Sequence, residues 1–218
     1  MIKAIVFDFD GVLADTEPLH LRAYQDVLAP LGLTLTRDEY YSRYLGFDDE
    51  GVFTALAEAH GFSLDRARLD SLIVEKGRVY DAFVEAGAVL YPGAAACIAA
   101  MARAFPLGIA SGALRHEIQT ILRATGLTNQ FRFIVASGDT AASKPAPDPY
   151  RRAAELHGIE PGHCLAIEDS RWGIESAKAA GLSCVAITHT YPRDQLSSAD
   201  AIVDSLAEFT PALVRALG

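Results

Sequence analysis

The segment AIVFDFDGVLADT, residues 4–16, decides the fold class of this chain. Its first half is apolar on both faces of an extended backbone, which is typical of a strand buried under helices on both sides. Two acidic residues, Asp8 and Asp10, end this apolar run, and Gly11 follows them. We therefore predict a first strand over residues 4–9, with acidic side chains at its carboxyl end.

Short apolar runs of the same kind recur along the chain, and each ends in polar residues or glycine. They are Leu107–Ala110, Phe133–Ala136, Cys164–Ile167, Cys184–Ile187 and Ala201–Val203. Helical patterns separate most of them, and this alternation predicts an α/β fold with a doubly wound, mostly parallel sheet.

The alternation is interrupted between residues 18 and 86, where apolar residues recur only at helical spacing. We predict an all-helical insert, a cap domain over residues 16–87, inside a core domain made of residues 1–15 and 88–218. An insert placed directly after the first strand is a candidate lid.

Composition limits the classes of partner. The 218 residues include 19 Lys and Arg against 28 Asp and Glu, a formal net charge of −9. This charge disfavours nucleic acid and anionic membrane surfaces as partners. The longest uncharged span, residues 86–102, contains Pro92-Gly93 and is too short and too rich in alanine to cross a membrane.

The three cysteines are an odd number and show no C-x-x-C spacing, so we expect neither a disulfide framework nor a zinc site. The apolar stretch before Asp8 is too short for a secretory signal. We expect a cytoplasmic protein, present as a monomer or a weak dimer.

Ligands of open parallel sheets bind at the carboxyl ends of the strands. The residues that follow the predicted strands are Asp8 with Asp10, then Ser111, Lys144, and Glu168 with Asp169. A single acidic pair is also common in a solvated turn, but two acidic strand ends favour a metal site. Carboxylate oxygens are the ligands that Mg²⁺ prefers, so we predict Mg²⁺ as the cofactor.

Two further segments suit a phosphate group. Lys144 lies in SKPAPDP, residues 143–149, where three prolines stiffen the backbone, although a solvated surface lysine is the alternative. Ser111-Gly112 offers a hydroxyl and accessible amides, although an ordinary strand-to-helix turn would look the same. Ser170 is predicted to cap the next helix.

The chain thus contains four short motifs in this order: Asp8-Phe9-Asp10-Gly11, Ser111-Gly112, Lys144-Pro145 and Glu168-Asp169. Together they resemble the motifs of the haloacid dehalogenase superfamily of aspartate-nucleophile phosphotransferases, and the resemblance covers essentially the whole chain. The insert is similar to the helical cap of the β-phosphoglucomutase and phosphoglycolate phosphatase branch. Thr16, His20 and Lys76 also match that branch.

The resemblance implies a role for each motif. Asp8 would attack phosphorus to form an aspartyl-phosphate, and Asp10 would act as general acid and base. Mg²⁺ would be held by Asp8, the main-chain carbonyl of Asp10, Asp169 and Glu168. Ser111 and Lys144 would neutralise the transferring phosphoryl group.

Substrate-binding candidates are Thr16, His20, Lys76, Gly112 and Arg115. A partly exposed histidine and a solvated lysine on a helix face are the alternatives for His20 and Lys76, and a surface arginine is the alternative for Arg115. We expect Trp172 to pack against neighbouring residues rather than to recognise the substrate.

The function that these features favour is a Mg²⁺-dependent phosphatase acting on a small phosphorylated metabolite, such as a sugar phosphate or phosphoglycolate. The alternative is a β-phosphoglucomutase-like sugar phosphate mutase. Asp49 falls where the resembling mutases carry a phosphate-gripping arginine, which favours hydrolysis. A catalytically silent binding module is disfavoured by the intact acids, Ser111 and Lys144.

Overall fold

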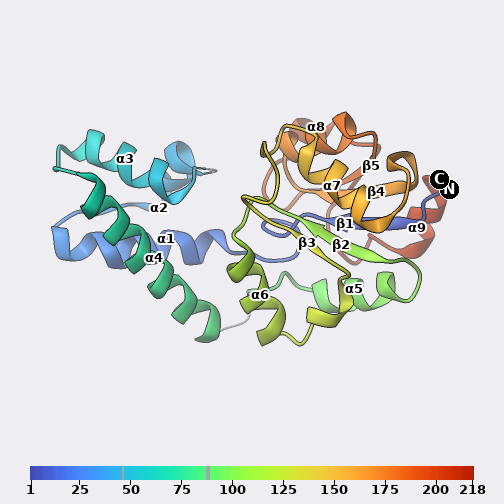
Figure 1. Ribbon diagram of the computed structural model, residues 1–218, viewed down its shortest axis with the longest axis horizontal. Helices are drawn as coiled ribbons and strands as arrows, with labels where there is room; N and C mark the ends of the chain where they lie inside the picture. Colours follow the sequence, from blue (N-terminus) through green and yellow to red (C-terminus); the bar gives the residue numbers. More distant parts are fainter. Residues whose placement is uncertain (46, 87–88) are drawn as a thin grey trace. The chain divides into compact units, whose positions relative to one another are not determined.

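The computed structural model describes residues 1–45, 47–86 and 89–218, and the chain divides into two compact units (Figure 1). Residues 1–15 and 88–218 form the larger unit, and residues 16–87 form the smaller one.

A six-stranded, all-parallel sheet forms the centre of the larger unit, as the apolar runs predict. Its strands are β1 (Ala4–Phe7), β2 (Leu107–Ala110), β3 (Ile134–Val135), β4 (Cys164–Glu168), β5 (Ser183–Ile187) and β6 (Ala201–Val203). Their order across the sheet is β3-β2-β1-β4-β5-β6, so β1 lies between β2 and β4. The predicted α/β doubly wound fold class is confirmed.

The first strand ends earlier than predicted, at Phe7 rather than Phe9. The carbonyl of Phe9 accepts hydrogen bonds from the amides of Leu13 and Ala14, so the backbone already turns there. Asp8 still donates to the adjacent strand, and this turn directs the residues after it away from the sheet at its carboxyl edge.

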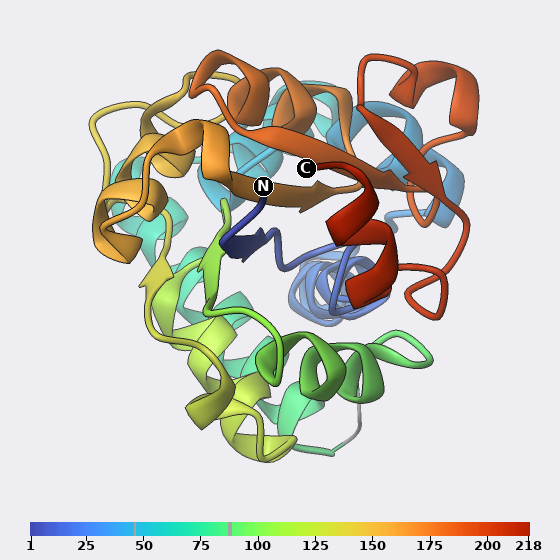
Figure 2. The ribbon, with the colours of Figure 1, turned by 90° about the vertical axis from the view of Figure 1, so that its right-hand side faces the viewer.

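Helices cover both faces of the sheet (Figure 2). In chain order they are α5 (Ala94–Ala102), α6 (Arg115–Ala124), η3 (Thr128–Gln130), α7 (Asp148–His157), η4 (Pro161–His163), α8 (Arg171–Ala179), η5 (Arg193–Leu196) and α9 (Pro211–Ala216). α7 and α8 pack on one face, over Val6, Ala166 and Cys184. On the other face, the ring of Phe7 meets Phe131 and Phe209 edge to face at 6.0 and 5.9 Å.

The described part of the smaller unit is helical. Its elements are α1 (Glu17–Leu28), η1 (Ala29–Leu31), α2 (Arg37–Glu39), η2 (Tyr40–Tyr44), α3 (Asp49–His60) and α4 (Arg66–Ala86). These helices share their own apolar core, which includes Tyr24, Leu28, Phe53 and Leu56. Among the helices described, none has both the length and the hydropathy that a membrane crossing requires.

Candidate active site

Asp8 directly follows β1 at the point of the sheet where the chain's strand order reverses. Its amide donates a hydrogen bond to the carbonyl of Ile167 in the adjacent β4, at 3.0 Å. The residue is 8% exposed. A carboxylate that emerges from a buried strand in this way needs a cation nearby.

Lys144 supplies a cation. Its Nζ atom lies 2.7 Å from Oδ1 of Asp8 and 2.6 Å from Oε1 of Glu168, so one ammonium group bridges two carboxylates. Burial alone would lower the pKa of Lys144, but the charges of Asp8 and Glu168 raise it above its usual value. Lys144 is therefore a fixed cation in this unit, and the alternative of a solvated surface lysine is wrong.

Glu168 ends β4 and is fully buried. Its Oε1 atom accepts a hydrogen bond from the Tyr150 hydroxyl at 2.7 Å, and its Oε2 atom accepts bonds from the Asp169 amide and the Ser170 hydroxyl, each at 3.2 Å. Ser170 also caps α8, because its Oγ atom accepts from the Gly173 amide at 3.1 Å, as predicted. The first turn of α8 thus fixes the position of this carboxylate.

Three buried carboxylates converge at this edge of the larger unit. Oxygen atoms of Asp8, Glu168 and Asp169 all lie within 4.8 Å of one another. Burial and the neighbouring Glu168 raise the pKa of Asp8 to about 7, and burial with the neighbouring Asp8 raises the pKa of Asp169 well above its usual range. Three close carboxylates against one ammonium leave an excess of negative charge, and this set of hard oxygen donors fits a divalent cation.

Gly11 makes room for the third carboxylate. Its φ of +74° lies in the left-handed region, where a side chain is strained. A Cβ atom at Gly11 would lie 1.9 Å from Oδ2 of Asp169, so only glycine permits this approach. The turn after Asp10 and the end of β4 are packed directly against each other.

Asp10 is half-buried, and its negative charge contributes to the raised pKa of Asp8. Ser111 follows β2, is buried, and its Oγ atom accepts a hydrogen bond from the Ala113 amide at 3.1 Å. Gly112 is exposed beside it. The sheet order places both strand ends at the same edge, and the roles of Asp10, Ser111 and Gly112 stay predictions.

Arg115 begins α6 and is engaged within the larger unit. Its guanidinium pairs with the Asp139 carboxylate and donates to the Ile134 carbonyl at 2.9 Å. Contact with an anionic substrate would have to compete with Asp139, so the predicted substrate role stays a prediction.

The smaller unit contains the other predicted substrate-binding residues. Thr16 is buried ahead of α1, and Lys76 is only 1% exposed, so the solvated-surface alternative for Lys76 is wrong. Its Nζ atom lies 2.7 Å from Oδ1 of Asp49 and 2.7 Å from Nδ1 of His20. Burial and the Lys76 charge lower the pKa of His20 well below its usual value, so this imidazole is neutral near pH 7.

Some residues at this edge were missed by the sequence analysis. Tyr150 lies on the first turn of α7, and His189 and Thr190 follow β5. The rule that ligands bind after strands also applies to β5, so it would have identified His189 and Thr190. Tyr150 has no such signal, because it reaches Glu168 from a helix face.

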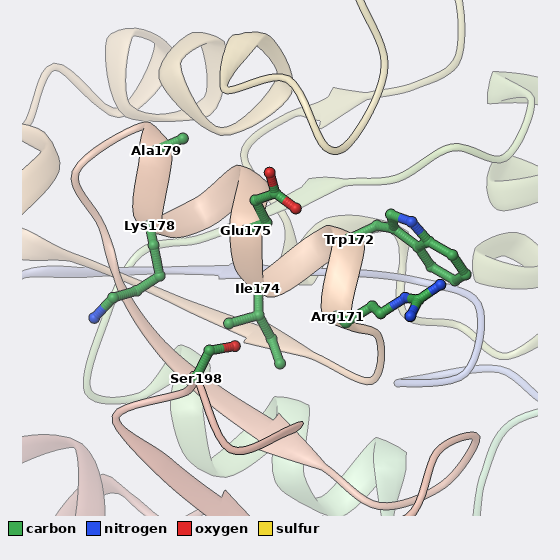
Figure 3. Close-up of a pocket in the computed structure, with 7 residues that line it drawn as sticks. All are labelled: Arg171, Trp172, Ile174, Glu175, Lys178, Ala179 and Ser198. Carbon is green, nitrogen blue, oxygen red and sulfur yellow. The ribbon is translucent and has the colours of Figure 1, made fainter. Parts of the chain in front are cut away.

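Trp172 packs less completely than expected. Its ring meets Tyr191 edge to face at 6.0 Å, yet the residue is 40% exposed. Figure 3 shows Trp172 and Arg171 side by side at the start of α8, at one end of an open groove that Lys178 and Ser198 also line. The guanidinium of Arg171 lies 4.3 Å from the centre of the Trp172 ring.

Comparison with known proteins identifies the family. Residues 2–181 match the model of haloacid dehalogenase-like hydrolases. Protein CbbY of Rhodobacter capsulatus is 35% identical over 214 residues, covering 94% of each chain. The phosphoglycolate phosphatase of Shigella boydii serotype 4 is 30% identical over 236 residues, covering 97% of this chain and 92% of that one.

A solved structure agrees with these matches. The crystal structure of a CbbY mutant from Rhodobacter sphaeroides, in complex with xylulose-1,5-bisphosphate, has a TM-score of 0.84 and 30% identity, covering 95% of this chain and 96% of that one. With its parallel sheet and its acidic cluster at the ends of β1 and β4, this chain belongs to the haloacid dehalogenase-like hydrolases.

Proposed function

We propose that this protein is a Mg²⁺-dependent phosphatase that hydrolyses a small phosphorylated metabolite through an aspartyl-phosphate on Asp8. The observation that carries the proposal is the contact between Lys144 Nζ and Asp8 Oδ1, at 2.7 Å, beside two further buried carboxylates. A carboxylate held against a fixed cation is oriented for attack on a phosphorus atom whose oxygens the same cation neutralises.

In the first step, an Oδ atom of Asp8 forms a bond to phosphorus while the bond between phosphorus and the ester oxygen breaks. Protonated Asp10 gives its proton to the departing alkoxide. In the second step, Asp10, now a carboxylate, takes a proton from a water molecule that attacks the same phosphorus. The bond from Asp8 to phosphorus breaks, and inorganic phosphate and the Asp8 carboxylate are released.

Asp8, Glu168, Asp169 and the main-chain carbonyl of Asp10 would hold the Mg²⁺ ion. When bound, the ion supplies positive charge that offsets the carboxylates and the phosphoryl oxygens. Ser111, at the end of the adjacent strand, would donate its hydroxyl to a phosphoryl oxygen.

The relatives support a sugar phosphate or phosphoglycolate as substrate, since CbbY was crystallised with xylulose-1,5-bisphosphate and another relative is a phosphoglycolate phosphatase. We assign Thr16, His20 and Lys76 to a substrate-binding cap domain over residues 16–87. Asp49 supports hydrolysis over mutase chemistry, because it stands where the resembling mutases carry a phosphate-binding arginine, and its carboxylate pairs with Lys76 instead of binding a second phosphate group.

The test is a panel of phosphorylated metabolites, scored by kcat/KM for phosphate release with Mg²⁺ and with a chelator. The panel includes xylulose-1,5-bisphosphate, phosphoglycolate, and β-glucose 1-phosphate with a bisphosphate primer. We expect hydrolysis that the chelator abolishes. Full activity in chelator would contradict the metal site, and conversion of glucose 1-phosphate to glucose 6-phosphate with little phosphate release would establish the mutase instead.

A further inference from the structure

The loop after β5, residues 188–192, lies against the acidic edge of the sheet, and we call it the β5 loop. β5 pairs with β4, and Ala186 is in register with Glu168. The chain that leaves β5 therefore passes next to Asp169, the residue after Glu168.

Thr190 contacts the Asp169 carboxylate. The Thr190 hydroxyl faces the Asp169 carboxylate and opposes the rise in the pKa of that carboxyl, as a hydrogen-bond donor does. A Cβ atom built on Gly11 would lie 1.9 Å from Oδ2 of Asp169 and 2.8 Å from Oγ1 of Thr190. The carboxylate is thus confined between the Gly11 backbone on one side and the Thr190 hydroxyl on another, which restricts its rotation.

His189 contacts the backbone of the turn that contains Gly11. Its Nδ1 atom lies 2.9 Å from the carbonyl oxygen of Gly11, and since a carbonyl only accepts, Nδ1 carries the hydrogen. The ring stacks on Tyr91 with centroids 3.9 Å apart and planes 23° apart, which fixes its orientation. Gly11 directly follows Asp10, whose own carbonyl is a predicted metal ligand.

The β5 loop is itself anchored at both ends. The Thr188 amide donates to the Val203 carbonyl at 3.1 Å, and the Thr188 hydroxyl donates to Asp204 at 3.0 Å. At the other end, Tyr191 packs on Trp172, which Figure 3 places at the start of α8. A loop held this way can position groups that contact it.

We propose that His189 and Thr190 are positioning residues that set the geometry of the metal site, acting through Gly11 and Asp169. This inference rests on the proposed function, because it concerns the Mg²⁺ ion. Groups that orient metal ligands without touching the metal typically change metal affinity by ~10–100-fold when they are removed. Thr190 would fix the Asp169 carboxylate, and His189 would fix the Asp10–Gly11 backbone.

The experiment measures the Kd for Mg²⁺ by titration calorimetry in the whole 218-residue chain. Thr190→Val removes the hydroxyl and keeps the shape, whereas Thr190→Ser keeps the hydroxyl. His189→Ala and His189→Asn form a second pair, since the asparagine amide retains a donor near the position of Nδ1. Thr128→Val, on exposed η3, controls for an added apolar surface methyl group.

We expect Thr190→Val and His189→Ala to weaken Mg²⁺ binding at least ~10-fold, with Thr190→Ser and His189→Asn close to the unmodified protein. Saturating Mg²⁺ should restore most of the lost kcat toward an aryl phosphate. Unfolding midpoints without Mg²⁺ should match across the set, which separates positioning from a loss of fold.

An unchanged Kd in Thr190→Val, or a Thr190→Ser variant as weak as Thr190→Val, would overturn the inference while leaving the proposed function in place. If the unmodified protein binds no Mg²⁺, the proposed function fails and the inference fails with it.

Discussion

The carboxyl group of Glu168 lies directly against Gly173, where a Cβ atom would sit 1.9 Å from the Cδ atom of Glu168. Gly173 is on the first turn of α8, and its amide donates to Ser170, which in turn donates to Glu168. The absence of a side chain at one helical position therefore allows the helix start and the buried acid to occupy their places.

Gly173→Ala tests this relationship. The added methyl group should displace the Glu168 carboxylate, weaken Mg²⁺ binding, and lower the free energy of unfolding by ~1–3 kcal/mol through overpacking. Calorimetric titration and chemical denaturation measure the two effects.

The matched control is Gly77→Ala in α4, where a Cβ atom would meet nothing within 4 Å. That change should stabilise the protein by ~0.5–1 kcal/mol, because alanine favours a helix interior. Equal effects of the two substitutions would contradict the role of Gly173.

Asp10→Ala tests the general acid. Loss of the proton donor should slow hydrolysis of an alkyl phosphate by ~10²–10⁴-fold, whereas an aryl phosphate, whose leaving group needs little protonation, should form the phosphoryl-enzyme at a rate closer to normal. Rapid-quench kinetics of the first turnover measure this step. Equal losses for both esters would remove Asp10 from the role of acid.

We expect the Lys76–Asp49 ion pair to contribute to the free energy of unfolding of the smaller unit. Asp49→Asn leaves the Lys76 ammonium buried beside the neutral His20, and should cost ~3–5 kcal/mol. Lys76→Met should cost less, because the Asp49 side chain is 21% exposed and still accepts a hydrogen bond from Tyr24.

Denaturant unfolding of both variants and of the double variant closes a thermodynamic cycle. If Asp49→Asn proved no more costly than Lys76→Met, the buried ammonium would not depend on Asp49 for its stability.

Because of the buried His157 side chain, we expect the free energy of unfolding to fall as the pH drops. Burial, reinforced by the Arg132 charge, lowers the pKa of this imidazole, which packs edge to face on Phe133 at 4.6 Å. The unfolded chain, with a histidine pKa near ~6.5, binds a proton more readily than the folded protein, so stability should fall as pH drops below that value.

His157→Gln should flatten this decline, which unfolding midpoints between pH 8 and pH 5 would reveal. A decline as steep in His157→Gln as in the unmodified protein would assign the effect to other groups.

Much of the fold follows from local pattern. Apolar runs bounded by glycine or acids mark five of the six strands to within a residue at each end, because strands buried on both faces exclude polar side chains. The first strand was predicted two residues too long, since Phe9 is apolar and buried but already belongs to a turn.

The candidate site could also be predicted from the sequence only in part. Asp8, Lys144, Glu168 and Asp169 follow from the rule that ligands gather after parallel strands, and the structure brings them together. The contact of Tyr150 with Glu168 and the pairing of Lys76 with Asp49 depend on how helices pack, which local sequence does not encode.

The central claim is that Asp8 carries the phosphoryl group, and it can be tested by trapping that group. Asp10→Asn, which should slow release of the intermediate, is mixed with an aryl phosphate and Mg²⁺, quenched in acid, and analysed by peptide mass spectrometry. Asp8→Asn in the same background and Asp26→Asn, an exposed acid on α1, serve as controls. The account predicts a phosphoryl adduct on Asp8 that disappears in Asp8→Asn and persists in Asp26→Asn. Phosphate release by the unmodified protein with no adduct on Asp8, or with an adduct on another residue, would contradict it.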